Sequence, residues 1–215
     1  MEITPGLTAS AITRTRTEWG PGAGSGYTNP NNRDFDRGNC GADRRHIFNL
    51  TSVAETPQFA NNKVRIVASG WRLSGIYRYT SGEWLTVTAG SDRALNGIGG
   101  QRGDQILASP YDDRSARPST NYLNRAAFAL PALGTFGNVG RTSIEGPANW
   151  QFDAALSRIF RFREDQRLEF RAEAYNVTNS FRPGNPNTAL NNSTFGQIRN
   201  AREPKIMQFA LKYVF

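Results

Sequence analysis

The chain has 215 residues, of which 38% are hydrophobic, and a formal net charge of +8. Its 21 Gly and 11 Pro, set against one Cys and one His, indicate a chain of strands and loops, and they exclude an internal disulfide framework and a multi-histidine metal site. The basic residues are spread along the chain, which permits anionic partners but lacks the dense basic run of a nucleic-acid arm, so we expect no nucleic acid partner.

Residues 1–43 carry few structural signals. They lack the basic start and apolar core of a secretory signal, and no stretch of the chain approaches the roughly 18 consecutive apolar residues of a transmembrane helix. We expect this part to be a loop-rich extracellular segment. Cys40 has no partner within the chain. A disulfide between Cys40 and a cysteine in a part of the protein upstream of this chain is one possibility.

Two strands are expected next, at residues 44–56 and 70–80, the second with a continuation through residues 84–88. Their alternation of apolar and polar residues is less clean than that of the later strands. A short polar connection at residues 57–63 joins them.

Residues 89–148 are rich in Gly, Pro, Asp and Arg and contain no convincing regular element, a length that argues against a compact soluble domain. Their glycines match no phosphate-binding fingerprint, and their aspartates lack the spacing of a calcium loop. A solvated loop is the simplest interpretation. The arginines that are candidates for contact with an anionic ligand or lipopolysaccharide are Arg93, Arg102, Arg114 and Arg117.

Two strands at residues 149–162 and 166–177 are joined by a tight polar turn at residues 163–165. The first has an apolar stripe that Arg158 interrupts, which suits a membrane only if Arg158 lies near an interface. The second alternates apolar residues with charges of alternating sign, which are costly in a core but suit the wall of a water-filled lumen, where they could pair across strands. This predicted lumenal charge ladder consists of Arg167, Glu169, Arg171 and Glu173.

The last strand, at residues 205–215, has the clearest alternation, with one apolar and aromatic face. Because the pattern ends in a terminal aromatic residue, it indicates a signal for the machinery that assembles outer-membrane barrels rather than a strand of a soluble sandwich. The residues of this predicted signal are Met207, Phe209, Leu211, Tyr213 and Phe215.

If Phe215 ends in the periplasm, the short connections at residues 57–63 and 163–165 are periplasmic, and the long ones at residues 89–148 and 178–204 are extracellular. That asymmetry is typical of bacterial outer-membrane barrels. We therefore predict an all-β fold, an antiparallel transmembrane β-barrel. Since about five strands are too few to close a barrel, residues 44–215 are expected to be the C-terminal part of a larger one.

Several segments resemble Oar-like TonB-dependent outer-membrane receptors. Upstream these are DRRHIFNLTSV and GWRLSGIYRYTSG, and downstream FGNVGRTSI, the strand with Trp150, RAEAYNVTNSF, GNPNT and TFGQI. The resemblance implies a plugged barrel of about 22 strands that takes up ligands across the outer membrane. It also implies that TonB is engaged only through N-terminal parts that this chain lacks, so that this chain alone transports nothing.

We thus expect a non-enzymatic membrane protein of the bacterial outer membrane, with an unknown ligand and no cofactor or metal. Its other expected partners are outer-membrane lipid, lipopolysaccharide and the outer-membrane assembly machinery. The alternative is a soluble β-sandwich that binds polysaccharide through exposed aromatics, namely Trp71, Trp84 and Trp150.

Overall fold

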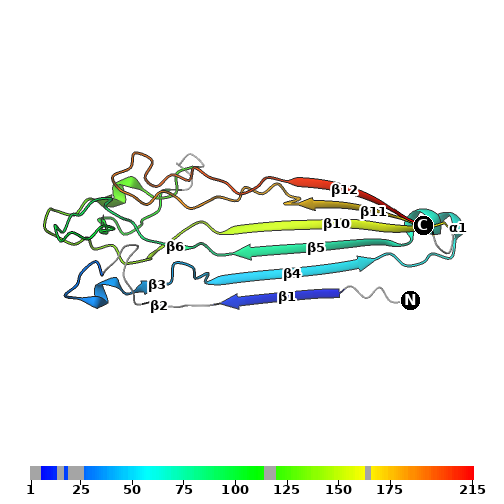
Figure 1. Ribbon diagram of the computed structural model, residues 1–215, viewed down its shortest axis with the longest axis horizontal. Helices are drawn as coiled ribbons and strands as arrows, with labels where there is room; N and C mark the ends of the chain where they lie inside the picture. The colour runs from blue at the N-terminus through cyan, green and yellow to red at the C-terminus, as the bar shows by residue number, and fades with distance from the viewer. Residues whose placement is uncertain (1–5, 14–16, 19–26, 114–119, 163–165) are drawn as a thin grey trace.

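The computed structural model describes residues 6–13, 17–18, 27–113, 120–162 and 166–215. Its main element is one antiparallel six-stranded sheet in the order β1-β4-β5-β10-β11-β12 (Figure 1). These strands are β1 (Gly6–Thr13), β4 (His46–Glu55), β5 (Trp71–Thr80), β10 (Asn149–Arg161), β11 (Arg167–Tyr175) and β12 (Ile206–Val214). The sheet is not closed, and the predicted all-β, antiparallel fold class is confirmed.

Each of the five predicted strands is present, with bounds that differ by a few residues at most. The structure adds a sixth strand, β1, inside residues 1–43, which we expected to be loop-rich. Its sequence, GLTASAIT, is short of large apolar residues, so its alternation is weak. Pairing with β4, which sets Ala9 against Leu50 and Ala11 against Phe48, defines it as a strand, and the sheet therefore begins before residue 44.

The connections between strands differ in length at the two ends of the sheet (Figure 1). At one end lie the β4–β5 connection and the C-terminus. The first contains the helix α1 (Asn62–Ala68), where we expected only a polar connection, and Asn61 caps α1 by accepting hydrogen bonds from the amides of Lys63 and Val64 at 3.0 and 3.4 Å. The predicted turn at residues 163–165 lies outside the described residues.

The long connections gather at the other end, where the described parts of residues 27–45, 81–148 and 176–205 form what we call the loop cap (Figure 1). Residues 84–88 do not continue β5 as expected, because only Trp84–Leu85 is a strand (β6) and it pairs with β9 (Ile144–Glu145). Further short elements in the long connections are β2 (Thr17–Glu18), β3 (Gly38–Asn39), β7 (Asp104–Gln105), β8 (Phe128–Ala129), and the 3-10 helices η1 (Arg33–Asp36) and η2 (Arg125–Ala127).

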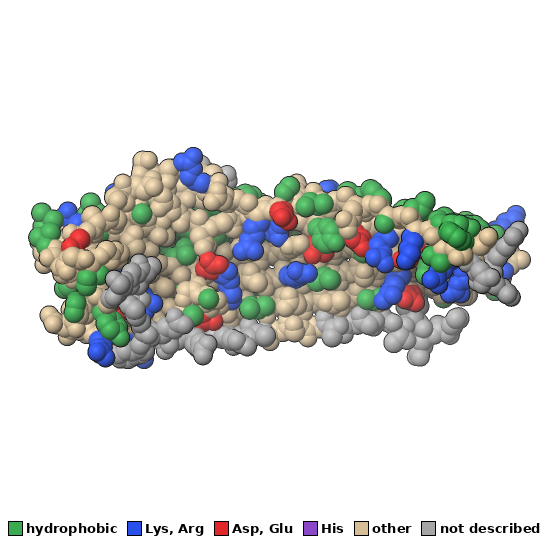
Figure 2. Space-filling model, viewed as in Figure 1, with side chains coloured by type: hydrophobic (Ala, Val, Ile, Leu, Met, Phe, Trp, Pro, Cys, Tyr) green, Lys and Arg blue, Asp and Glu red, His purple; other side chains and the backbone are tan. Residues whose placement is uncertain are grey.

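The two faces of the sheet differ in chemistry because the strand register sets apolar residues beside apolar residues, and polar residues beside polar residues, across neighbouring strands. One row sets Leu156 against Leu73 and Ala172, and the next row on the other face sets Ser157 against Arg72 and Arg171. We call these the apolar face and the polar face. Basic and acidic side chains are spread over the strands on the side of the sheet seen in Figure 2.

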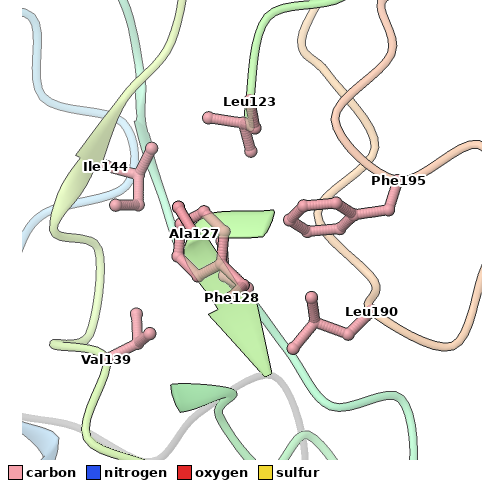
Figure 3. Close-up of a cluster of buried hydrophobic side chains, with 8 residues drawn as sticks. Leu123, Ala127, Phe128, Val139, Ile144, Leu190 and Phe195 are labelled. Atoms are coloured by element: carbon pink, nitrogen blue, oxygen red, sulfur yellow. The ribbon is translucent and has the colours of Figure 1, made fainter. Parts of the chain in front are cut away.

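The hydrophobic core of the described residues lies in the loop cap and not against the sheet (Figure 3). Segments from the β5–β10 and β11–β12 connections meet there, with the rings of Phe128 and Phe195 5.5 Å apart in an edge-on arrangement. The loops are thus a packed unit in their own right. The buried members of the cluster are Val87, Leu123, Ala127, Phe128, Val139, Ile144, Leu190 and Phe195.

One glycine in the loop cap tests how closely its segments pack. A Cβ at Gly137 would overlap the backbone carbonyl oxygens of Arg102 and Gly103, whereas a Cβ at Gly99 would meet nothing within 4 Å. We expect Gly137→Ala to destabilise the loop cap by roughly 1–3 kcal/mol, the usual cost of overpacking, and Gly99→Ala to leave it unchanged. Hydrogen exchange of the Val139 amide, which donates to the Gly103 carbonyl at 3.1 Å, measures this. Equal exchange in both variants would contradict the packing described.

Candidate functional site: the sheet faces and the loop cap

The apolar face is uncovered along β12. The four predicted signal residues of that strand alternate on this face, and the ring of Phe215 stacks on that of Tyr213 with centroids 5.9 Å apart. These five side chains are 52–89% exposed. Leaving each of them in water forfeits about 1.5–3 kcal/mol of burial free energy, so this face requires an apolar environment. The residues are Met207, Phe209, Leu211, Tyr213 and Phe215.

Aromatic residues of three neighbouring strands contact one another on the same apolar face. Tyr77 lies between Phe48 and Trp150, with ring centroids 6.2 and 6.1 Å away. Further along the sheet, Trp71 meets the edge of Phe170 at 6.3 Å. Such pairs stabilise the sheet by cross-strand contact on this face.

Arg158, the charge that interrupts the apolar stripe, is covered rather than exposed. Its guanidinium donates hydrogen bonds to the carbonyl oxygens of Ile66 and Val67, the latter at 2.8 Å. The same group lies 5.2 Å from the ring centroid of Trp71 and 4.5 Å from that of Phe160. The charge therefore sits at the α1 end of the sheet, where helix carbonyls and aromatic faces offset its removal from water.

The polar face carries the predicted lumenal charge ladder, and all four of its residues lie on it. The ion pairs run along β11 and not across strands as we expected, because Arg171 contacts both Glu169 at 2.9 Å and Glu173 at 3.6 Å. Across strands, Glu173 instead accepts a hydrogen bond from Gln208 of β12. Elsewhere on this face, ion pairs do cross between strands, at Arg72–Glu55 and Arg78–Asp153. A lumenal role for the ladder Arg167, Glu169, Arg171 and Glu173 stays a prediction.

A buried ion pair ties residues 27–39 to the rest of the loop cap. The side chains of Asp36 and Arg102 are 1% and 3% exposed, with Oδ1 and Nη1 3.7 Å apart. The second oxygen of Asp36 accepts a hydrogen bond from the Thr28 amide at 2.6 Å, and the guanidinium of Arg102 stacks 3.7 Å from the ring centroid of Phe35. Burial lowers the pKa of Arg102, which Asp36 opposes and Arg141 reinforces, yet a guanidinium stays charged in proteins.

The four arginines predicted as ligand contacts do not form one site among the described residues. Arg102 is buried in the pair with Asp36 and holds the loop cap together. Arg93 is half-buried and donates from Nε to the Pro131 carbonyl at 2.7 Å. Arg114 and Arg117 lie outside the described residues, so contact of any of the four with a ligand stays a prediction.

The loop cap contains an open cleft of about 770 Å³ between residues 112 and 121–126 on one side and 190–197 on the other. Its described lining is dominated by side-chain amides and includes the cation Arg125, 5.4 Å from the ring centroid of Phe195. This cleft could not be predicted from the sequence, because its two walls come from connections far apart in the chain. The polar residues that line it are Asp112, Asn121, Asn124, Arg125, Asn191, Asn192, Ser193 and Gln197.

A smaller pocket of about 370 Å³ lies where the polar face meets the loop cap. Arg182 of the cap donates to the Gln151 side chain of β10 and to the Glu203 carbonyl, the latter at 2.8 Å. The pocket therefore joins the sheet to the cap through polar contacts. Its lining residues include Gln151, Tyr175, Asn176, Arg182, Glu203 and Gln208.

Within the part of the chain that the structure describes, no group of three or more His, Cys, Asp or Glu side chains is placed to hold a metal ion. No described helix has both the length and the apolar character needed to cross a membrane.

Comparison with known proteins identifies one family. A family model described as "Outer membrane beta barrel domain" matches residues 9–208, which include β4, β5, β10 and β11 in full, most of β1 and only the start of β12. No curated protein and no solved structure gives a significant match.

The buried ion pair of the loop cap generates a prediction. Removing one partner of such a pair leaves the other charge buried and uncompensated, so we expect Asp36→Ala to destabilise the docking of residues 27–39 by roughly 3–5 kcal/mol. Exchange of the Thr28 amide should then accelerate by about a hundredfold or more, since each 1.4 kcal/mol is tenfold. Asp34→Ala, at an exposed position of the same 3-10 helix, is the matched control and should change little. An Asp36→Ala protein with native Thr28 protection would refute the assignment.

Proposed function

This chain belongs to the outer membrane beta barrel domain family, which locates it in the bacterial outer membrane, and we propose that it is part of a receptor there. In this proposal it forms the C-terminal part of the wall of an Oar-like TonB-dependent receptor. The receptor identity rests on the resemblance of segments such as FGNVGRTSI and RAEAYNVTNSF to that group. The proposed activity is ligand uptake across the outer membrane by the whole receptor, without enzymatic chemistry.

One observation carries this proposal, namely that the six-stranded sheet has two chemically opposite faces and two open edges. Among the described residues, β1 pairs only with β4, and β12 only with β11. Unpaired backbone groups are not tolerated in hydrocarbon, so further strands must pair with both edges to complete the wall. The apolar face then meets lipid and the polar face lines the lumen.

The unequal connections orient the wall. Short turns of outer-membrane barrels face the periplasm and long loops face outward, so α1 lies at the periplasmic rim and the loop cap outside the cell. We place ligand capture at the amide-lined cleft of the cap, because it is the larger of the two pockets described above and lies on this outward side. Lipopolysaccharide is the proposed neighbour of the cap at the membrane surface.

The alternative of a soluble polysaccharide-binding sandwich is wrong. A sandwich needs a second sheet over the apolar face, and the described residues supply none. Trp71 and Trp150 lie on that face among other aromatics, which is the lipid side of the wall. Trp84 lies in the loop cap, with the guanidinium of Arg45 5.1 Å from its ring centroid.

The energy-coupling partner gives the most direct test of the receptor identity. TonB is proposed to act through parts of the receptor outside this chain, so the intact protein should cross-link to TonB in living cells and copurify with it. Loss of that cross-link on removal of the segments N-terminal to this wall is the expected control. An intact, correctly assembled protein that never cross-links to TonB would leave an outer-membrane barrel and overturn the receptor assignment.

The terminal strand generates a separate prediction about assembly. We propose that the machinery that inserts outer-membrane barrels reads the apolar stripe of β12 that ends at Phe215. Deleting Phe215 from the intact protein should lower the amount that reaches the outer membrane several-fold, as measured by fractionation and by the heat-dependent gel mobility of folded barrels. Phe215→Tyr keeps a terminal aromatic and should assemble normally. Normal assembly of the deletion variant would refute the signal.

A further inference from the structure

The helix α1 is short and rests on the sheet through its C-terminal end. It has seven residues, none of which is buried. Two side chains of the apolar face bind its last carbonyls: Arg158 donates to Ile66 and Val67, and the indole Nε1 of Trp71 donates to Val67 at 2.9 Å. The C-terminal end of α1 therefore lies at the lipid side of the periplasmic rim, not at the lumen side.

The contact between Arg158 and α1 is chemically complementary. The last carbonyls of a helix lack partners within the helix and carry partial negative charge. A cation on a lipid-facing strand is costly unless it is paired. Each feature offsets the cost of the other, and Trp71 and Phe160 flank the cation on the apolar face. We call Arg158 and Trp71 the helix clamp.

The apolar side chains of α1 are exposed in the described structure. Val64, Ile66 and Val67 are 43%, 70% and 69% exposed. At 100° per residue, Val67 lies about 40° from the stem of Lys63, with Val64 and Ile66 on either side of this pair. Arg65 lies nearly opposite Val67 and donates to the Asn62 side chain at 2.6 Å. The helix thus has an apolar side, with a basic tip, and a polar side.

We propose that α1 is an interfacial anchor that lies in the headgroup region of the periplasmic phospholipid leaflet. Val64, Ile66 and Val67 reach the acyl chains, and the ammonium of Lys63 extends to lipid phosphates. The helix clamp holds α1 against the wall at that depth. This inference rests on the proposed orientation of the wall in the outer membrane and is independent of TonB and of any ligand.

Phospholipid, and not a protein, is the occupant that fits. The C-terminal end of α1 is bound by two side chains of the apolar face, the proposed lipid surface of the wall, so α1 is held at the edge of that surface. A helix of seven residues offers far less than the roughly 800 Å² that each partner of a stable protein interface buries. The charge of Lys63 matches the phosphate of a phospholipid headgroup.

Depth-dependent fluorescence quenching tests the anchor. The intact protein, with Cys40→Ser to remove the native thiol, is labelled at Val67→Cys with an environment-sensitive fluorophore and placed in phosphatidylethanolamine–phosphatidylglycerol vesicles without other proteins. We expect blue-shifted emission and strong quenching by lipids with a nitroxide near the headgroup. The same label at Arg65→Cys, on the opposite side of α1, should be quenched several-fold less. Water-like, unquenched emission at position 67, or equal quenching at both positions, would overturn the proposal.

The role of the helix clamp is tested in the same vesicles. Arg158→Met should lower quenching at position 67 several-fold while the barrel keeps its heat-dependent gel mobility. Arg161→Met, at an exposed position on the polar face of the same strand, is the matched control and should leave quenching unchanged. If Arg158→Met does not assemble, Trp71→Phe removes one hydrogen bond of the clamp and should weaken quenching. Undiminished quenching in an assembled clamp variant would overturn the role of Arg158 and Trp71.

Discussion

Backbone hydrogen bonding in hydrocarbon is the constraint on which the rest of this structure depends. A strand that crosses a membrane has no water to bind its amides and carbonyls, so neighbouring strands must satisfy them. The six strands do so in an antiparallel register that also sorts side chains by face, as in the row of Leu73, Leu156 and Ala172. Backbone hydrogen bonding between the strands thus fixes both the pairing of the strands and the separation of an apolar face from a polar face.

The same constraint explains why the hydrophobic core lies in the loops. A single sheet between lipid and lumen has nothing to pack against, so the apolar residues of the strands stay exposed in this chain, as Phe209 and Leu211 do. The loop cap meets water, and water drives its apolar residues together around Phe128 and Phe195. Buried Asp36 and Arg102 join another segment to it. The connections of the loop cap thus form a defined surface with a cleft.

Arg158 shows how a local exception is accommodated. Its position on the apolar face would be costly for a bare guanidinium, and the carbonyl end of α1 with two aromatic rings offsets that cost at the α1 end of the sheet. Arg158 therefore marks the place where the apolar face of the sheet binds the β4–β5 connection. The opposite face tolerates its charges differently, since Arg171 lies between two carboxylates of its own strand.

Period-two alternation in the sequence determined five strands, because a strand between two different solvents must alternate. The alternation of short and long connections then determined the antiparallel barrel class and its location in the outer membrane. Period-two alternation could not reveal β1, whose small residues alternate weakly and which pairing with β4 defines. Nor could it reveal that Arg102 is buried against Asp36, or that Asn124 and Asn191 line one cleft. Those facts depend on contacts between loops far apart in the chain, and only the tertiary structure decided them, since no local pattern encodes which loops meet.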